Sequence, residues 1–591
     1  MSIVAELKPI IVSTLKELYQ KDFDESALTI NLTKPEFEGD YTLVLFSFVK
    51  DLKKKPEELG NEIGDQLKTS HPELITGFNV IKGFLNLHIN GNYWSNFLEG
   101  NYRQTKLAEA VASAEKVMVE YASPNTNKPL HLGHLRNIFL GWSIAEILEA
   151  TGAEVSKTSI SNNRGIHINK SMIAWQQYAN GATPESTGIK GDHLVGDYYV
   201  MFGQKHKEQI AAMMQEGFSK EDAEKEAPIM KAAQEMLIDW EEGKKEVIDL
   251  WETMNNWVYK GFDETYTRIG VNFNKHYYES DTYLLGKELV DEGLQKGVFF
   301  KKEDGSVWID LTADGLDEKL VLRKDGTSVY ITQDLGLADE KYKDFPYTQS
   351  IYVIADEQNY HMKVLKLILQ KLGKPYADGI YHLSYGMVEL PSGRMKTREG
   401  TVVDADDIID ELVKVAAAKT EELGKVKDFS KTELKELYNT IGLGALKFFL
   451  LRVDPKKRMV FNPEESIDFH GFTGPFVQYT HARIKSILRS EPLNDAQLAA
   501  SPLLPLEKEL LVLLEQYETT VQQAASEHNP SLLAIYAFNV AKVFNSFYAA
   551  HSVRSAETEE KKNLRLKISS LTANTIASAM GLLGIQVPER M

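Results

Sequence analysis

The sequence predicts an α/β protein in which a Rossmann-like parallel-sheet domain with a helical insertion lies between a small N-terminal α/β domain and an all-α C-terminal domain. Three observations support this fold class. The chain has 591 residues, too many for a single hydrophobic core. Residues 116–160 follow a strand–helix–strand pattern, which is typical of a parallel α/β unit. Beyond about residue 405 the strand signals disappear and helical periodicity continues to the end.

Residues 1–108 are predicted to form the N-terminal domain. The first segment, "MSIVAELKPIIVSTLKELYQ", carries Glu6 and Lys8 in an amphipathic pattern, which indicates a helix rather than a signal peptide. Further along, "GFNVIKGFLNLHIN" alternates like a pair of strands. No apolar run approaches the ~18 residues that a membrane span needs, so we expect a cytoplasmic protein with no membrane partner.

Residues 109–410 are predicted to form the Rossmann-like domain. The strand "KVMVEYA" is followed by a turn, by the apolar helix "LRNIFLGWSIAEILEATG" and by the strand "AEVSKTSIS". Residues 170–262 are helical and acidic, and we interpret them as an insertion. Strand patterns return at "GVNFNKHYY", "VFFKKEDGSVWIDL", "LVLRKDGTSVYIT", "SIYVIAD" and "GIYHLSYGMVEL". Residues 411–591 are then predicted to form the helical C-terminal domain.

Composition limits the chemistry that is available. The chain has no cysteine, which rules out disulfides, thiol nucleophiles and metal sites with cysteine ligands. The formal net charge of −18 disfavours a polyanionic partner when it is taken alone. Residues 441–490, however, carry eight basic and four acidic side chains, a local charge of +4. A basic face on an acidic protein remains compatible with binding to nucleic acid.

The stretch "SPNTNKPLHLGHLRN" occupies the turn between the first strand and the first helix of the Rossmann-like domain. The start of a helix presents free N–H groups and the positive end of its dipole, which together favour phosphate. His131 and His134 share one helix face, so both can donate to phosphate oxygens. Gly133 leaves room for a ligand against the backbone. Histidines at this spacing can also be a surface or metal coincidence, and H-x-G-H alone is a weak signal.

A second candidate element is "MVELPSGRMKTREGTVVDADDII". A strand leads into a loop with glycine and basic residues, and a helix opens at residues 404–406. Lys396 and Arg398 can act as cations on a polyphosphate. A solvated hairpin is the alternative interpretation of such a loop.

In this order, the two elements resemble the two signature motifs of class I aminoacyl-tRNA synthetases. "HLGH" matches the first, and "RMKTR" matches the second loosely, because Thr397 stands where a second lysine is usual. Arginyl-tRNA synthetases commonly lack that lysine and carry another just before the first motif, where this chain has Lys128. The resemblance to that family covers residues 20–591, through "EYASPNTNKPLHLGHLRN", "NNRGIHI", "LVLRKDGTSVYITQDLGLA", "IYVIADEQNYH", "VQYTHARIKSILR" and "VPERM".

The resemblance implies a reaction and its substrates. Members of the family ligate L-arginine to tRNA(Arg). The carboxylate of arginine attacks the α-phosphate of ATP, giving arginyl-adenylate and pyrophosphate, and the terminal ribose of the tRNA then takes the arginyl group. The family typically needs bound tRNA for the first step, and we expect the same here, with Thr397 making the loop dependent on an ordered partner. ATP would enter with Mg²⁺, with no zinc, no organic cofactor and no metal ligands from the protein, and the protein would be a monomer.

The family's site residues fall on matching positions of this chain. Catalysis would involve Lys128, His131, His134, Lys396 and Arg398, and ATP would be bound by Gly133, His131, His134, His361 and Met395. Arginine would be bound by Glu120, Asn125, Tyr330, Asp334 and Gln358. A guanidinium is always charged and pairs best with carboxylates, which suits Glu120 and Asp334. Tyr330 and Asp334 are four residues apart, so one helical turn would present both. The alternatives are a surface acid for Glu120, a helix N-cap for Asp334 and a core histidine for His361.

The C-terminal half supports a tRNA partner. The segment "TGPFVQYTHARIKSILR" places aromatic, basic and histidine residues on one predicted helix. RNA-binding proteins stack unpaired bases on such rings, although a helical bundle with aromatic core positions is the alternative. Tyr479 and Met591 are predicted to contact the anticodon. The N-terminal domain resembles the family's domain that meets the tRNA elbow.

Two other functions stay open at this point. Another class I synthetase, such as the cysteinyl one, shares the nucleotide site, although the missing cysteine ligands and the acidic pocket count against it. A synthetase-like RNA-binding protein that has lost catalysis is the non-enzyme alternative. The intact Lys128, His131, Gly133 and His134 count against that second alternative.

Overall fold

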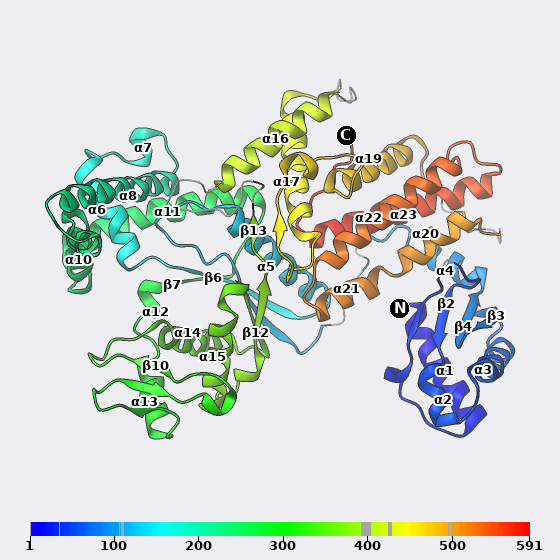
Figure 1. Cartoon of the computed structure of the whole chain (residues 1–591). Coiled ribbons are helices and arrows are strands. Elements are labelled where there is room, and N and C mark those ends of the chain that lie inside the picture. The colour runs from blue at the N-terminus through cyan, green and yellow to red at the C-terminus, as the bar shows by residue number, and fades with distance from the viewer. Residues whose placement is uncertain are drawn as a thin grey trace.

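The computed structural model describes residues 2–34, 36–105, 107, 112–389, 391, 403–422, 428–494, 496–498 and 502–591. It has the predicted fold class: a parallel sheet with a helical insertion, a small N-terminal α/β domain and a helical C-terminal domain. In Figure 1 the N-terminal domain (blue) lies beside the C-terminal helices (orange and red), and the insertion lies on the opposite side of the molecule.

The N-terminal domain is an antiparallel sheet of order β1-β2-β4-β3 that packs against helices. The predicted strand pair is confirmed, since β3 and β4 form a hairpin. Its turn residues Lys82 and Gly83 have φ values of 50° and 81°, the conformation that a two-residue hairpin turn requires. The elements are α1 (Ile3–Tyr19), η1 (Glu25–Ala27), β1 (Ile30–Leu32), β2 (Tyr41–Val44), α2 (Phe46–Leu52), α3 (Pro56–Ser70), β3 (Ile75–Ile81), β4 (Phe84–Ile89) and α4 (Gly91–Asn101).

The central sheet is parallel throughout, in the order β12-β11-β5-β6-β7. The chain leaves the middle strand β5 through helix α5, which packs on β5, β6 and β11. Because β6 and β11 flank β5 on opposite sides, the carboxyl end of β5 is the switch point where such sheets bind ligands. The elements are β5 (Lys116–Glu120), α5 (Leu132–Ala150), β6 (Glu154–Ser161), β7 (Lys275–Tyr278), α14 (Tyr330–Asp344), β11 (Gln349–Ala355), η3 (Asp356–Gln358), α15 (Asn359–Lys371), η4 (Ala377–Gly379) and β12 (Ile380–Tyr385).

The predicted helical insertion lies between β6 and β7. Its helices are α6 (Ile166–Tyr178), α7 (Pro184–Thr187), α8 (Gly191–Gln215), α9 (Lys220–Glu226), α10 (Pro228–Glu241) and α11 (Lys245–Ile269). A small antiparallel sheet of order β10-β9-β8 follows β7. Its region contains α12 (Glu279–Thr282), α13 (Lys287–Gln295), β8 (Phe300–Lys301), β9 (Val307–Ile309), η2 (Thr312–Asp314) and β10 (Lys319–Leu322).

The segment "LVLRKDGTSVYIT" differs from its prediction as a strand. Only its first part forms β10, and Tyr330 already begins helix α14. The chain turns between them at Gly326, whose φ is 79°, while the Asp325 carboxylate accepts a hydrogen bond from the Thr327 N–H at 2.9 Å. The aspartate–glycine turn therefore overrides the strand propensity of the residues that follow.

The C-terminal part is helical. Its helices are α16 (Ala405–Glu422), α17 (Lys431–Leu451), α18 (Pro463–Ser466), α19 (Gly474–Ser490), α20 (Pro505–Glu515), α21 (Tyr517–Ser526), α22 (Ser531–Ala550) and α23 (Glu559–Leu582). The prediction that strands end at about residue 405 is wrong in one place. Strand β14 (Met459–Val460) pairs in parallel with β13 (Val388–Glu389), and two residues are too few to leave a periodic pattern.

Helix α22 corrects the expectation that no segment resembles a membrane span. Within the described residues, it alone is long and apolar enough to cross a membrane by length and composition. Several of its apolar side chains, among them Val540, Phe544 and Phe547, are buried in the core. It packs against α19, α20, α21 and α23, as the central helix of a bundle does.

Candidate active site

The chain bends sharply where it leaves β5. Ala122 and Ser123 both have positive φ values, 77° and 32°, a conformation that costs free energy in residues with a Cβ atom. Asn137 of α5 stabilises this bend. Its Oδ1 accepts from the Ala122 N–H at 2.7 Å, and its Nδ2 donates to the Val353 carbonyl of β11 at 2.6 Å. The buried amide thus joins the turn, the helix and the neighbouring strand.

The two histidines of the first motif lie at the start of α5, as predicted. His131 is the N-cap residue, and its Nδ1 accepts a hydrogen bond from the Gly133 N–H at 3.1 Å. His134 Nδ1 accepts from the His131 N–H at 3.1 Å, so the pair forms a reciprocal capping box. The two rings stack with centroids 3.8 Å apart. A Cβ atom at position 133 would lie 3.1 Å from the His131 ring, so Gly133 leaves room for that ring.

Burial fixes the charge of both rings, and these hydrogen bonds fix their tautomer. Burial, reinforced by the positive charge of Lys128, lowers the pKa of His131 to about 3. Burial also holds the pKa of His134 well below its ordinary value, with His131 and Lys128 adding to the effect. Both rings are therefore neutral at pH 7. Because each Nδ1 is an acceptor, each Nε2 carries the proton and can donate it to an oxygen of a ligand.

Lys128 lies just before the histidines and is partly buried. Burial lowers the pKa of its ammonium group. In the described part of the chain this ammonium has neither a hydrogen-bond partner nor an ion-pair partner. A desolvated cation without a counter-charge is suited to an anionic ligand.

The second motif lies largely outside the described residues. Met395, Lys396 and Arg398 all belong to that part, as does Thr397. The chain that follows returns to the first motif: the Ala405 N–H donates to the Leu130 carbonyl at 3.0 Å, and the Leu132 N–H donates to the Val403 carbonyl at 3.4 Å. The predicted helix opening at residues 404–406 is confirmed by α16.

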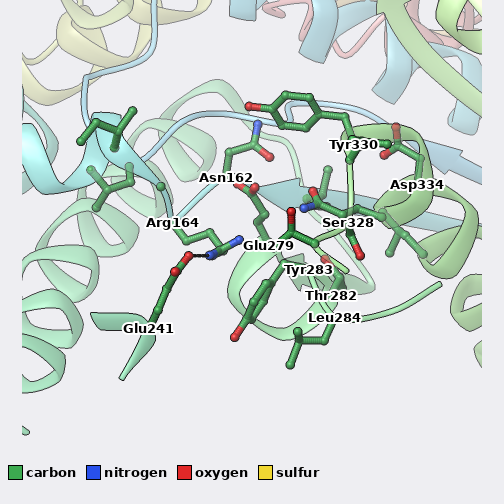
Figure 2. Close-up of a pocket in the computed structure, with 18 of the residues that line it drawn as sticks. Asn162, Arg164, Glu241, Glu279, Thr282, Tyr283, Leu284, Ser328, Tyr330 and Asp334 are labelled. Carbon is green, nitrogen blue, oxygen red and sulfur yellow. Dashed lines mark hydrogen bonds and ion pairs between the residues drawn. The ribbon is translucent and has the colours of Figure 1, made fainter. Parts of the chain in front are cut away.

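A cavity of about 840 Å³ opens at the carboxyl ends of the strands (Figure 2). Three predicted arginine-binding residues, Asn125, Tyr330 and Asp334, are among the residues that line it. Tyr330 and Asp334 lie one turn apart on α14, as expected, and the Tyr330 side chain is largely exposed. Glu120 and Gln358 are not among the lining residues.

Asp334 forms a close pair with His361 of α15. His361 Nε2 and Asp334 Oδ2 are 2.5 Å apart. This hydrogen bond raises the pKa of His361. Asp334 is predicted to bind arginine and His361 to bind ATP, whereas the structure brings the two residues together at the edge of the pocket. One carboxylate oxygen of Asp334 is therefore engaged, and within the described residues the other has no hydrogen-bond or ion-pair partner.

Glu120 is buried at the end of β5 and pairs with the fully buried Lys341 of α14. The Lys341 ammonium also lies 4.2 Å from the centre of the Tyr352 ring. The predicted pocket contained two acids for one guanidinium, but the charge of Glu120 is balanced inside the protein. Lys341 gave no sequence signal, since nothing distinguishes it from the lysines around it.

Sequence reasoning also missed Arg164 and Glu279, which line the same pocket. Arg164 lies 3.8 Å from the Tyr283 ring centre and forms a 2.9 Å ion pair with Glu241. Burial raises the pKa of Glu279, Arg164 opposes that shift, and Asp334 adds to it. The block "NNRGIHI" marked the position of Arg164, but its aromatic partners lie far away in the sequence.

The two predicted anticodon contacts both belong to the helical C-terminal part of the chain. Tyr479 is on α19, where the Arg483 guanidinium lies 4.9 Å from its ring centre. The tail that ends at Met591 is held on the same helix. His481 Nδ1 donates to the Pro588 carbonyl at 2.9 Å, and Lys485 pairs with Glu589 at 2.9 Å.

Comparisons with known proteins agree with this architecture. Residues 99–462 match the model for "tRNA synthetases class I (R), catalytic domain", residues 477–591 match the DALR anticodon binding domain, and residues 5–89 match the arginyl tRNA synthetase N terminal domain. The chain therefore belongs to the class I aminoacyl-tRNA synthetases.

Relatives define the family within that class. An arginine–tRNA ligase of Bacteroides thetaiotaomicron is 51% identical over 100% of both chains, and one of Flavobacterium psychrophilum is 50% identical with the same coverage. The structure of Thermus thermophilus arginyl-tRNA synthetase matches with a TM-score of 0.82 and 26% identity over 100% of both chains. This chain belongs to the arginyl-tRNA synthetase family. The cysteinyl alternative is accordingly set aside.

Proposed function

We propose that this enzyme ligates arginine to tRNA in two steps, through an arginyl-adenylate. The overall reaction, arginine–tRNA ligation by a class I synthetase, is that of the family to which the chain belongs. In the first step an arginine carboxylate oxygen attacks the α-phosphorus of ATP, and the bond to pyrophosphate breaks. In the second step a terminal ribose hydroxyl of the tRNA attacks the arginyl carbonyl carbon, and AMP leaves.

The turn between β5 and α5 would bind the phosphates. His131 and His134 would donate their Nε2 protons to α-phosphate oxygens and so stabilise the charge that develops there. Lys128, Lys396 and Arg398 would neutralise the β- and γ-phosphates together with the Mg²⁺ that accompanies ATP. Gly133, Met395 and His361 complete the proposed ATP site. Catalysis then rests on positioning and electrostatics, without a covalent enzyme intermediate.

The pocket at the strand ends would bind arginine. Asp334 lines the cavity, and its second carboxylate oxygen suits a guanidinium. Asn125 and Gln358 would bind the α-ammonium group, and Tyr330 would close the site. Glu120 stays a proposed ligand of arginine. In that role its charge would be shared between Lys341 and the substrate.

The tRNA would span all three domains, which we propose to divide at 1–108, 109–410 and 411–591. Tyr479 and Met591 would contact the anticodon, and the N-terminal domain would meet the elbow. We further propose that adenylate formation requires bound tRNA, and that the enzyme is a cytoplasmic monomer.

The observation that carries this proposal is the pair of neutral, capped histidines beside Lys128, whose ammonium has no partner in the described part of the chain. We would measure arginine-dependent ATP–pyrophosphate exchange with and without total tRNA, on the wild type and on Lys128→Ala. Lys116→Ala is the control, because Lys116 lies at the opposite end of β5 in a surface pair with Glu154. We expect exchange only with tRNA, lost in Lys128→Ala and kept in Lys116→Ala.

Other outcomes would change the proposal in defined ways. Exchange without tRNA would keep the enzyme and refute the tRNA requirement. No exchange with arginine in folded wild-type protein would favour the RNA-binding protein without catalysis. Normal exchange by Lys128→Ala would refute the role of that lysine.

A further inference from the structure

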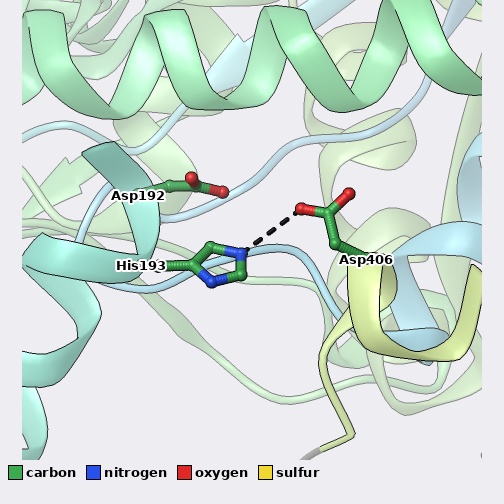
Figure 3. Close-up of side chains that lie close together, drawn as sticks. All are labelled: Asp192, His193 and Asp406. Carbon is green, nitrogen blue, oxygen red and sulfur yellow. Dashed lines mark hydrogen bonds and ion pairs between the residues drawn. The ribbon is translucent and has the colours of Figure 1, made fainter. Parts of the chain in front are cut away.

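A polar network connects the helical insertion with the start of α16 (Figure 3). The Lys190 ammonium, which precedes α8, lies 2.7 Å from Asp406 Oδ2 and 3.2 Å from Asp192 Oδ2. It also donates to Thr265 Oγ1 of α11 at 2.6 Å. Three elements far apart in the sequence thus converge on one cation.

His193 adds a second link between the same elements. Its Nε2 lies 3.3 Å from Asp406 Oδ2 and 3.4 Å from Asp404 Oδ2. The hydrogen bond to Asp406 raises the pKa of His193. Burial works to raise the pKa of Asp406, but hydrogen bonds from His193 and Lys190 outweigh it and hold that pKa below its ordinary value.

Asp192, His193 and Asp406 could also suggest a metal site, since their ligand atoms lie within 4.8 Å of one another. The position of Lys190 argues against this interpretation. Its ammonium already lies between the two carboxylates and supplies the positive charge that a metal ion would bring. The group is better described as an ion-pair network whose role is to hold elements together.

The segment that this network holds is the one that pairs with the first motif. Asp404 and Asp406 flank Ala405, whose N–H donates to the Leu130 carbonyl just before His131. A displacement of Asp406 would therefore be transmitted through a single residue to the phosphate-binding turn.

Helix α8 also contacts the first motif directly. A Cβ atom at Gly196 would lie 2.7 Å from Pro129 Cδ, so α8 packs closely on the residue that follows Lys128. The helix is itself fixed against α11. A Cβ atom at Gly191 would lie 2.1 Å from the Trp257 carbonyl oxygen, and one at Gly261 would lie 2.2 Å from Asp192 Oδ1. Close packing at three glycines leaves α8 little freedom to shift.

We propose that the start of α8 positions the phosphate-binding turn for ATP, with Lys190 and Asp406 as its main positioning residues. Lys190 and His193 hold the segment at residues 403–406. This segment in turn is hydrogen-bonded to the turn that carries His131. The proposal rests on the assignment of that turn to ATP in the proposed function. It gives the insertion a role in the first step of the reaction.

The test compares Lys190→Met and Asp406→Asn with the wild type in arginine-dependent exchange with tRNA present. We expect kcat/KM for ATP to fall about 10- to 100-fold, since small misplacements of a catalytic turn have effects of this size, while KM for arginine changes less than about twofold. Lys190→Arg should recover part of the loss. The double variant should be about as impaired as the worse single variant, because both changes break one interaction.

Two further variants sharpen the test. Lys245→Met is the matched control, since Lys245 lies on α11 of the same insertion in an exposed pair with Asp249, and we expect wild-type kinetics. Gly196→Ala perturbs the Pro129 contact without removing a charge, and it should reproduce the loss for ATP even if Asp406→Asn does not fold.

Folded variants with unchanged kcat/KM for ATP would overturn the proposal. So would an equal loss for ATP and arginine together with a large fall in melting temperature, because that pattern indicates a merely structural role. A wild type without arginine-dependent exchange would instead refute the proposed function. Calorimetric titration of ATP alone into the same variants would then decide the positioning role separately, with unchanged affinity overturning it.

Discussion

The turn that we propose to bind phosphate and the pocket that we propose to bind arginine meet at the same edge of the sheet, yet they are built by different means. The two histidines of the turn, His131 and His134, are uncharged and accept hydrogen bonds from backbone N–H groups, and Lys128 is the cation beside them. The pocket uses charged side chains that bind one another, Asp334 with His361 and Arg164 with Glu241.

This difference indicates how each region meets its ligand. The turn is preorganised, because its hydrogen bonds already fix the direction of each Nε2 proton. The pocket holds its acids in ion pairs that an arginine guanidinium can compete for or share. We therefore expect changes in the turn to alter the rate of the chemical step, and changes in the pocket to alter the affinity for arginine.

The largest expected effect concerns the buried ion pair between Glu120, at the end of β5, and Lys341 of α14. Lys341→Met leaves the Glu120 carboxylate buried without its partner, which should lower the free energy of unfolding by about 3–5 kcal/mol. Thermal denaturation would measure the change. The double variant Glu120→Gln/Lys341→Met should recover most of the loss. A single variant as stable as the wild type would show that Glu120 is not held by this pair.

The next effect separates the two functions of a histidine in the turn. His134→Asn keeps an acceptor near the position of Nδ1 and loses the Nε2 donor, so kcat for exchange should fall about 10²- to 10³-fold with KM for arginine unchanged. His134→Gln keeps a donor near Nε2 and should lose less. If Asn were the better replacement, capping rather than donation would be the main function of His134.

A smaller effect is expected in the pocket. Asp334→Asn removes the charge that faces the guanidinium, and KM for arginine should rise about 30- to 100-fold with a smaller change in kcat, as for a truncated charge pair. Asp339→Asn is the control, since Asp339 lies on the same helix and accepts from the Tyr376 hydroxyl at 2.9 Å. Equal effects of both changes would contradict a direct role for Asp334.

The smallest expected effect is a dependence of KM for arginine on pH. The pKa of His361 is raised above its ordinary value of 6.5, so its ion pair with Asp334 is complete below pH 6.5 and is lost as the pH rises through the raised value. Loss of that pair frees Asp334, and KM for arginine should then fall about two- to fivefold, the range of a partly exposed pair. The fall should disappear in His361→Gln. A wild-type KM that rises with pH would contradict the competition.

The sequence was sufficient to predict the features that depend on residues close to one another along the chain. The two histidines at the start of α5 and the shared turn of Tyr330 and Asp334 both follow from helical spacing, and the structure has both. The pairing of Glu120 with Lys341 could not be predicted, because it joins residues 221 positions apart through the packing of α14 on the sheet. The same holds for the contact of residues 403–405 with the first motif.

The two-step reaction predicts where an oxygen atom goes. The enzyme would be supplied with arginine labelled with ¹⁸O in its carboxylate, together with ATP and tRNA, and the AMP product would be analysed by mass spectrometry. Attack of the carboxylate on the α-phosphorus, followed by transfer of the arginyl group, leaves one ¹⁸O atom in each AMP. AMP without the label, formed while arginyl-tRNA accumulates, would contradict an arginyl-adenylate intermediate.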